Sequence, residues 1–185
     1  MSTQPSTIYL SDIENEKGGG FVINGADPYD LSGYHFSIAG DVNGDGFDDV
    51  IIGARYADPL GANDNAGSAY VVYGNSSTTT FDLSNLEYGN SNYGFSIHGA
   101  SSYDRLGHVS AAGDVNGDGF DDVIVGASHA DSAHQDRAGQ AYVIYGSDSR
   151  TGRVRVSDLL NYTGNSSSGG SGTSGQGNNG GGHGG

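Results

Sequence analysis

The sequence of 185 residues contains no cysteine, which excludes a disulfide framework and a cysteine nucleophile but leaves the cellular compartment open. It also lacks any continuous apolar run long enough to cross a bilayer, so the pattern predicts no membrane span. Only seven Lys and Arg residues oppose 22 Asp and Glu residues, and the net charge of -15 argues against a nucleic-acid partner, whose phosphates require a basic surface. The N-terminal segment lacks the basic and apolar regions of a secretory signal, so we expect any export to use another route or a signal already removed.

The most informative feature that is present is the stretch DVNGDGFDD, which occurs at 41–49 and returns unchanged at 114–122. Oxygen-bearing groups recur at alternate positions, and two glycines let the backbone turn so that these oxygens converge. No nitrogen or sulfur ligand lies in the stretch, which favours a hard cation, and Ca²⁺ suits such a flexible loop better than Mg²⁺. We therefore predict two Ca²⁺ sites. Their predicted ligands are Asp41, Asn43, Asp45, the Phe47 carbonyl and Asp49 in the first loop, and Asp114, Asn116, Asp118, the Phe120 carbonyl and Asp122 in the second.

A simpler interpretation of the stretch is an acidic turn between two strands, because Asn-Gly and Asp-Gly are strong hairpin signals by themselves. The two identical copies favour a cation, since the carboxylates clustered in each stretch repel one another unless a positive charge neutralises them. Spacing excludes an EF-hand, because Ile52 and Val125 stand where its bidentate glutamate would be and the flanking segments have the pattern of strands.

The two loops belong to a longer repeat. The segment Leu-Ser-Asp-Ile at 10–13 returns in related form at 83–86 and again, after an equal interval, at 156–159. Regular repeats of this kind are typical of arrays and propellers. The 34 glycines and 12 tyrosines also suit a turn-rich β protein better than a helical one.

Each repeat unit is expected to hold four short strands, one directly before the loop and one directly after it. The third strand is the Ala-Tyr-Val run at 69–74 or 141–146, and the outer strand is the Phe-x-Ile-x-Gly segment at 21–25 or 95–99. The strand after each loop is continuously apolar, as expected of a blade that neighbouring blades cover on both faces. The predicted fold is therefore all-β, with two four-stranded β-propeller-type blades that form an incomplete propeller.

The order of these segments resembles the FG-GAP repeat, the unit of integrin α-subunit β-propellers and of many secreted bacterial proteins. The segments that carry the resemblance are 33–40, the loop, 50–54 and 66–74. The resemblance extends over residues 8–160, and in that family the nine-residue loop carries calcium, which corresponds here to the ten ligands given above. Arg55 and Ser128 stand where the family has proline, and the second copy is one residue shorter before its loop, but neither departure affects a predicted ligand.

The predicted organisation has four regions. These are an N-terminal segment with the outer strand of a preceding blade (1–31), a first blade (32–99), a second blade without its outer strand (100–163), and a Gly/Ser/Asn-rich tail (164–185). The tail has the composition of a flexible linker, although a strap held against a neighbouring subunit is the alternative.

Two blades do not close a propeller, which typically has four to eight. The N-terminal segment holds one outer strand too many, and the second blade lacks one. We therefore hypothesise that copies join head to tail by strand complementation. The product would be a ring of three or four chains or an open fibre. A fragment of a longer propeller explains the same pattern.

Three classes of function remain on the sequence alone. The favoured prediction is a calcium-binding protein of the cell exterior or cell surface that assembles into a fibre, ring or surface structure with an adhesive or structural role. The alternative is a fragment of a larger integrin-like propeller that binds a protein or carbohydrate ligand. An enzyme is not predicted, because no Gly-x-Ser-x-Gly elbow occurs. His129 and His134 flank Asp131, but they fit an exposed polar loop better than a transition-metal site.

Overall fold

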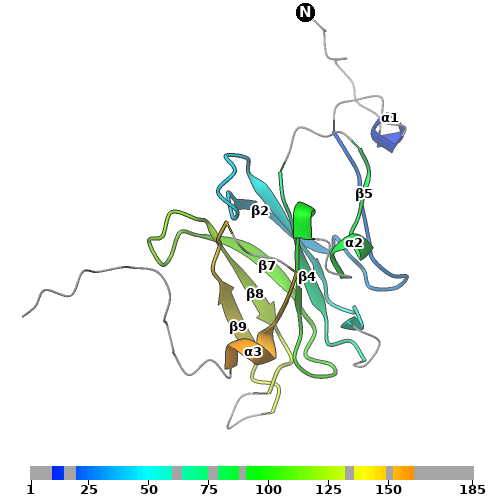
Figure 1. The fold of residues 1–185 in the computed structure, drawn as a ribbon. Coiled ribbons are helices and arrows are strands. Elements are labelled where there is room, and N and C mark those ends of the chain that lie inside the picture. The colour runs from blue at the N-terminus through cyan, green and yellow to red at the C-terminus, as the bar shows by residue number, and fades with distance from the viewer. Residues whose placement is uncertain are drawn as a thin grey trace, which may run out of the picture.

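The structure, a computed structural model of the full chain, shows a protein built almost entirely of short strands (Figure 1). It describes residues 10–14, 20–59, 64–74, 79–87, 91–131, 136–148 and 152–160. The predicted Gly-rich tail and His134 lie outside the described residues. Among the described helices, none is long and apolar enough to cross a membrane.

The first repeat forms a five-stranded sheet with the strand order β10-β6-β4-β3-β2, which we call blade 1. Four of its strands form the predicted meander, in which each strand runs antiparallel to the next. The fifth strand, β10, pairs in parallel with β6 and was not predicted. The bounds are β2 His35–Gly40, β3 Asp49–Ala54, β4 Ser68–Val72, β6 Gly94–His98 and β10 Arg153–Arg155.

The second repeat forms a three-stranded antiparallel sheet, blade 2, from β7 (Leu106–Gly113), β8 (Asp122–Ala127) and β9 (Gln140–Ile144). Within the described residues, no strand pairs with the outer edge of β9. The all-β class and the two propeller-type blades are thus as predicted. Among the described residues, blade 1 has β10 as a fifth strand beside the four expected, and blade 2 has three strands.

A third, two-stranded sheet stands apart from both blades and consists of β1 (Ile23–Asn24) and β5 (Phe81–Asp82). The two strands run parallel, with Ile23 opposite Phe81. The β6–β10 pair has the same arrangement, with Ile97 opposite Val154. By position in the repeat, β1 corresponds to β6 and β5 to β10, so the β1–β5 ribbon is the outer part of a blade whose three inner strands the described chain does not provide.

The main hydrophobic core lies between the two blades. Ile51, Val71 and Phe95 of blade 1 pack with Val123 and Val125 of blade 2 in one buried cluster. A second, smaller cluster lies on the opposite side of blade 1, where Ile52 and Tyr70 meet Leu83 and Leu86 under the β1–β5 ribbon. Figure 1 accordingly shows blade 2 on one side of blade 1 and the ribbon on the other.

Three very short helices occupy the recurring Leu-Ser segments, for which the sequence predicted no helix. They are α1 (Leu10–Glu14), α2 (Ser84–Glu87) and α3 (Val156–Leu160), and a 3₁₀ turn, η2 (Ser91–Tyr93), precedes β6. Helices this short leave no visible 3.6-residue periodicity in the sequence. Tertiary packing stabilises them instead, as the buried Leu86 of α2 indicates.

Candidate cation-binding loops and an open blade face

The two predicted cation loops occupy equivalent places in the fold. Loop 1 (41–48) connects β2 to β3, and loop 2 (114–121) connects β7 to β8. Gly44 and Gly46 adopt left-handed φ angles of 76° and 88°, and Gly117 and Gly119 adopt 77° and 94°. These backbone angles strain any residue with a Cβ, which explains why both loops use glycine at these positions.

The first aspartate of each loop organises the turn. In loop 1, Asp41 Oδ1 accepts hydrogen bonds from the N–H groups of Gly44 (2.7 Å) and Asp45 (3.0 Å), and its Oδ2 accepts one from Gly46 (2.9 Å). Asp114 accepts the three equivalent bonds in loop 2, at 2.7, 3.1 and 2.9 Å. The carboxylate therefore shapes the loop as well as carrying charge.

The residues at positions 3 and 5 of each loop are linked to one another. Asn43 Oδ1 accepts a hydrogen bond from the Asp45 N–H at 3.0 Å, and Asn43 Nδ2 donates one to Asp45 Oδ2 at 2.9 Å. Asn116 and Asp118 repeat both contacts. The structure thus brings positions 1, 3 and 5 of each loop together, as the alternating spacing predicts.

The aspartate at position 9 is buried, unlike the others. Both of its carboxylate oxygens accept backbone hydrogen bonds: Asp49 Oδ2 from Val42 at 2.9 Å and Oδ1 from Gly74 at 2.8 Å. Burial raises the pKa of Asp49 to about 6, the two hydrogen bonds oppose that rise, and the nearby Asp45 and Asp41 carboxylates add to it. Asp49 therefore connects its loop to the end of β4.

Asp122 makes the same structural contribution at position 9 of loop 2, and this contribution was not predicted from the sequence. Asp122 accepts hydrogen bonds from the N–H groups of Val115 and Gly146, each at 2.9 Å. A valine follows the position 9 aspartate in both copies, where an apolar strand begins. This was the available signal that the carboxylate is buried.

The donor set of each loop fits a hard cation. Three carboxylates, one side-chain amide and one backbone carbonyl are all oxygen donors, and a carboxylate oxygen that accepts an N–H retains a further lone pair. Among the described residues, no three His, Cys, Asp or Glu side chains form a ready-made metal cluster. Coordination through positions 1, 3, 5, 7 and 9 would thus draw the carboxylates of each loop closer together.

The two loops touch across the boundary between the blades. The Asp41 N–H donates to Asp121 Oδ2 at 2.9 Å, and the Asp121 N–H donates to the Asp41 carbonyl at 3.1 Å. The Ser147 N–H adds a bond to the Val42 carbonyl at 3.0 Å. Asp121, at position 8 of loop 2, was not a predicted ligand, and the structure shows that it joins one loop to the other.

The histidines outside the loops form no metal site in the described part of the chain. His35 and His108 lie side by side on β2 and β7 with ring centroids 4.3 Å apart. Burial, together with the positive charges of His35 and Arg55, lowers the pKa of His108. The His129 ring lies 3.5 Å from the Arg105 guanidinium.

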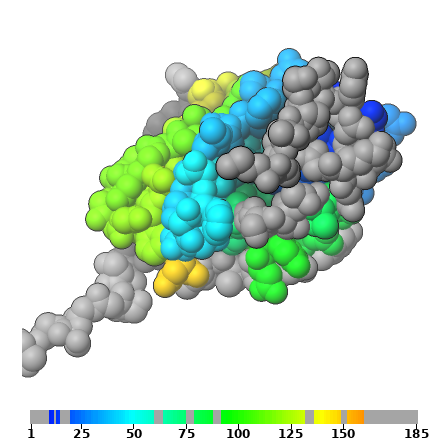
Figure 2. Space-filling view, turned by 90° about the horizontal axis from the view of Figure 1, so that it is seen from above, coloured from blue at the N-terminus to red at the C-terminus, as the bar shows by residue number. Residues whose placement is uncertain are grey.

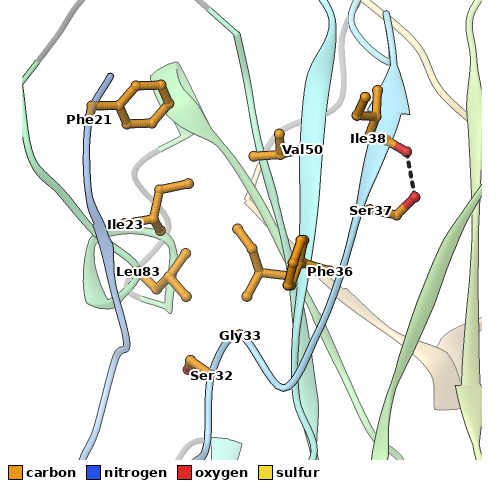
Figure 3. A pocket seen from close by; sticks show the side chains of 10 residues that line it. Phe21, Ile23, Ser32, Gly33, Phe36, Ser37, Ile38, Val50 and Leu83 are labelled. Carbon is orange, nitrogen blue, oxygen red and sulfur yellow. Dashed lines mark hydrogen bonds between the residues drawn. The ribbon is translucent and has the colours of Figure 1, made fainter. Parts of the chain in front are cut away.

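The structure also reveals a feature that no sequence motif indicated, an apolar pocket on the side of blade 1 that faces away from blade 2. The pocket has a volume of about 510 Å³ and lies between the β1–β5 ribbon and the β2–β3 hairpin. Figure 3 shows Phe21 and Ile23 on one side of it and Val50 and Phe36 on the other. Phe36 and Ile38 of β2 are 74% and 65% exposed, which is unusual for large apolar residues on a blade face.

Comparisons with known proteins agree with the repeat found in the fold. A family model described as "FG-GAP repeat" matches residues 32–72 and 106–144, which include the two loops and the three strands of each repeat around them. The chain is 35% identical over 114 residues to "Integrin alpha pat-2" of Caenorhabditis elegans, a match that covers 58% of this chain. It is 32% identical over 140 residues to "Phosphatidylinositol-glycan-specific phospholipase D" of Rattus norvegicus, covering 74% of this chain. The chain spans 9% of the first relative and 15% of the second.

Proposed function

This chain carries two FG-GAP repeats of the integrin α-subunit kind, and from that premise we propose that it is a calcium-stabilised propeller unit of the cell exterior or cell surface, with an adhesive or structural role. In this proposal each loop binds one Ca²⁺, and copies of the chain assemble head to tail into a ring, fibre or surface structure. The ion neutralises the clustered carboxylates and rigidifies the hairpin at the rim of each blade.

The observation that carries the calcium proposal is the repetition of one loop geometry at two places. The hydrogen bonds of Asp41 and Asp114 match in donor and acceptor, and the contacts between positions 3 and 5 are the same in both loops. Burial is the main cause of the raised pKa of Asp49, and repulsion from the other carboxylates of its loop adds to it. A bound divalent cation relieves such repulsion.

The relative named as an integrin α subunit supports an adhesive role. The relative named as a phospholipase D supports a catalytic role as the alternative. The matched part is a small share of each relative. We propose a non-catalytic role because the family model assigns FG-GAP repeats to this chain. If the chain is instead a binding module within a larger propeller, a protein ligand fits the integrin similarity best, and a carbohydrate remains a further candidate.

Thermal unfolding with and without calcium tests the metal sites. Extracellular calcium modules bind with Kd values of roughly 10⁻⁴ to 10⁻³ M, so about 5 mM Ca²⁺ should add about 1–2 kcal/mol of stability per site. The midpoint should rise by about 4–16 °C for two sites. Asp45→Ala and Asp118→Ala should each remove about half of this rise, and the combined variant nearly all of it.

The matched control is Asp148→Ala, which removes an exposed carboxylate outside both loops and should leave the calcium-dependent rise intact. A rise that survives in the combined Asp45→Ala, Asp118→Ala variant would show that the ligands are wrong. Negative-stain microscopy in calcium and in chelator then tests assembly. Rings or filaments that disappear in chelator support it, and single small particles in both conditions contradict it.

A further inference from the structure

The contact between blade 1 and blade 2 shows which features hold two neighbouring blades together. Besides the shared core, backbone N–H groups just before β7 donate to carbonyls just before β4. These hydrogen bonds are Tyr103 to Asp64 (2.7 Å), Arg105 to Asn65 (3.2 Å) and Leu106 to Ala66 (3.0 Å).

A backbone approach that only glycine permits completes this contact. A Cβ placed on Gly53 of blade 1 would lie 1.9 Å from the Gly107 carbonyl oxygen of blade 2. Any side chain at this position would push the two blades apart.

The front of blade 1 has the same docking features as the front of blade 2, although no blade covers it in the described chain. Tyr29 and Leu31 precede β2 with left-handed φ angles of 73° and 55°, and the equivalent Tyr103 and Arg105 have 66° and 55°. Such angles are costly for residues with a side chain. The segment before β2 is therefore already shaped to make the contacts that Tyr103 and Arg105 make with blade 1.

The surface behind this segment is apolar. Its β2 residues are open to solvent, whereas Ile52 of β3 is buried under the β1–β5 ribbon. We call this surface the front face and define it as Phe36, Ile38, Val50 and Ile52, which lie opposite one another on β2 and β3. In Figure 2 the light-blue to cyan segment that includes β2 lies at the surface of the molecule. The equivalent of Phe36 on β7 is Val109, which is half-buried because blade 1 packs against it.

The back of blade 2 presents the complementary half. We define this back face as Ile124, Gly126, Val143 and Tyr145, on β8 and in and just after β9. Val143 is 41% exposed, whereas its blade 1 counterpart Val71 is fully buried against blade 2. Gly126 corresponds to Gly53, and a Cβ placed on it has as its nearest neighbour only the Cβ of His108, at 3.4 Å.

From this match we infer that the gap between the β1–β5 ribbon and the front face of one copy is filled by the β7-β8-β9 sheet of a second copy, so that β9 of one chain pairs antiparallel with β1 of the next. The composite sheet β7-β8-β9-β1-β5 then has the strand order of blade 1, in which β4 pairs with β6 and β6 with β10. This inference rests on the head-to-tail assembly proposed above and specifies its interface. A second copy is the occupant because its back face carries the same features that blade 1 already uses to bind blade 2.

The within-chain pairing also fixes the register between copies. In blade 1, Ser68 lies opposite His98, and their side chains meet at 3.1 Å. The equivalent positions are Gln140 on β9 and Asn24 on β1, so Gln140 of one copy should lie opposite Asn24 of the next. By the same mapping, Val143 pairs with Phe21 across the composite sheet, and Gly126 approaches the Gly33 carbonyl.

Because the chain has no cysteine, single cysteines can map this register without background. Full-length Gln140→Cys and Asn24→Cys chains are mixed in millimolar Ca²⁺, oxidised mildly, and analysed on non-reducing gels. The disulfide between them should exceed that of an Ala141→Cys and Asn24→Cys mixture by at least about tenfold, because a disulfide requires close Cα atoms and facing Cβ atoms. Ala141 lies next to Gln140 on β9 but points to the opposite face of the sheet.

Light scattering on the same samples separates the two levels of the proposal. Large particles without the specific disulfide, or with equal disulfide in both mixtures, would overturn this interface and leave self-assembly standing. Monomers that form no disulfide would overturn both, and would assign the gap to a blade from elsewhere in a longer chain or from another protein.

Gly126→Ala provides an independent check that does not depend on cysteine chemistry. The added methyl group fits within a single chain, so the thermal midpoint of the monomer should stay within about 1 °C of the wild type, as for other surface changes. Assembly should fall at least about tenfold, because the methyl group would meet the neighbouring backbone as a Cβ on Gly53 would. Normal assembly of this variant would contradict the predicted interface.

Discussion

Blade 1 and blade 2 are two copies of one sequence pattern that differ in what covers them. Val71 and Val143 occupy the same place on the third strand of their blades, yet the first is fully buried and the second is 41% exposed. Val42 and Val115 occupy the same place in the two loops, and their exposed fractions are 0% and 55%. The difference shows that each repeat encodes a sheet with two apolar faces, and that the neighbouring blade decides which of those faces is buried.

The largest effect is expected from placing a charge at the equivalent residues Val71 and Val143. Val71→Asp places a carboxylate in the core between the blades and should unfold the chain or cost at least about 4 kcal/mol, since no partner there can compensate an isolated charge. Val143→Asp, at the equivalent position, should change monomer stability by less than about 0.5 kcal/mol and should abolish assembly. Urea denaturation measures the first effect and light scattering the second. Equal destabilisation by both variants would mean that the back face is already covered in the monomer.

A smaller difference in stability is expected between substitutions at position 9 of the two loops. Asp49→Asn, measured without calcium, replaces one of two acceptor oxygens by a donor that faces a buried N–H, so we expect a loss of about 3 kcal/mol. Asp122→Asn should cost about 1 kcal/mol less, because its loop partner Val115 is exposed and water can replace the lost bond. Chemical denaturation in a chelator distinguishes the two variants. A larger loss for Asp122→Asn would contradict the structural asymmetry.

The smallest effect concerns the outer strands. His98 of β6 is buried between the hydroxyls of Ser68 and Ser96, and burial, followed by the charges of Arg153 and Arg155, lowers its pKa from 6.5 to about 4. The folded state therefore favours the neutral His98 ring. Its contribution to the free energy of unfolding is complete above pH 6.5 and is lost as the pH falls toward 4, because the unfolded chain binds the proton more readily. Between pH 7 and pH 5 this loss should be about 2 kcal/mol.

His98→Asn, which introduces the residue present at the equivalent position 24 of β1, should remove that part of the pH dependence. Denaturation midpoints at pH 7 and pH 5 for both proteins provide the measurement. The same pH slope in wild type and variant would show that another group causes the acid sensitivity.

Most of the strands and both loops could be predicted from the sequence because their signals are local. The residues at positions 1 and 3 make their turn-forming hydrogen bonds within the loop, and β3 and β8 follow it as continuous apolar runs. Strands β5 and β10 could not be predicted, since strands this short carry no usable periodicity and each pairs with a strand from a distant part of the chain. The structure brings positions 1, 3 and 5 of each loop together, and calcium binding itself stays a prediction.

The pocket had no sequence signal, whereas open apolar faces are expected of two blades that do not close a propeller. Phe36 and Ile38 alternate along β2 as core residues do. They are exposed because blade 2 covers the opposite face of blade 1. In the same way, nothing in the residue type of Gly126 distinguishes it from Gly53, although a Cβ on Gly53 would collide with the Gly107 backbone and one on Gly126 would only touch His108.

The sequence by itself determined the repeat, the oxygen-rich loops, the all-β class and the mismatch between surplus and missing outer strands, because each depends on spacing along the chain. The tertiary structure alone decided which faces are buried, how β1 pairs with β5 and β6 with β10, and how Asp121 joins the two loops. The physical reason is that burial and parallel pairing depend on which segments distant in the chain become neighbours. In the described chain, blade 2 covers one face of blade 1 and blade 1 covers the other face of blade 2, so two copies of one local pattern acquire different surroundings.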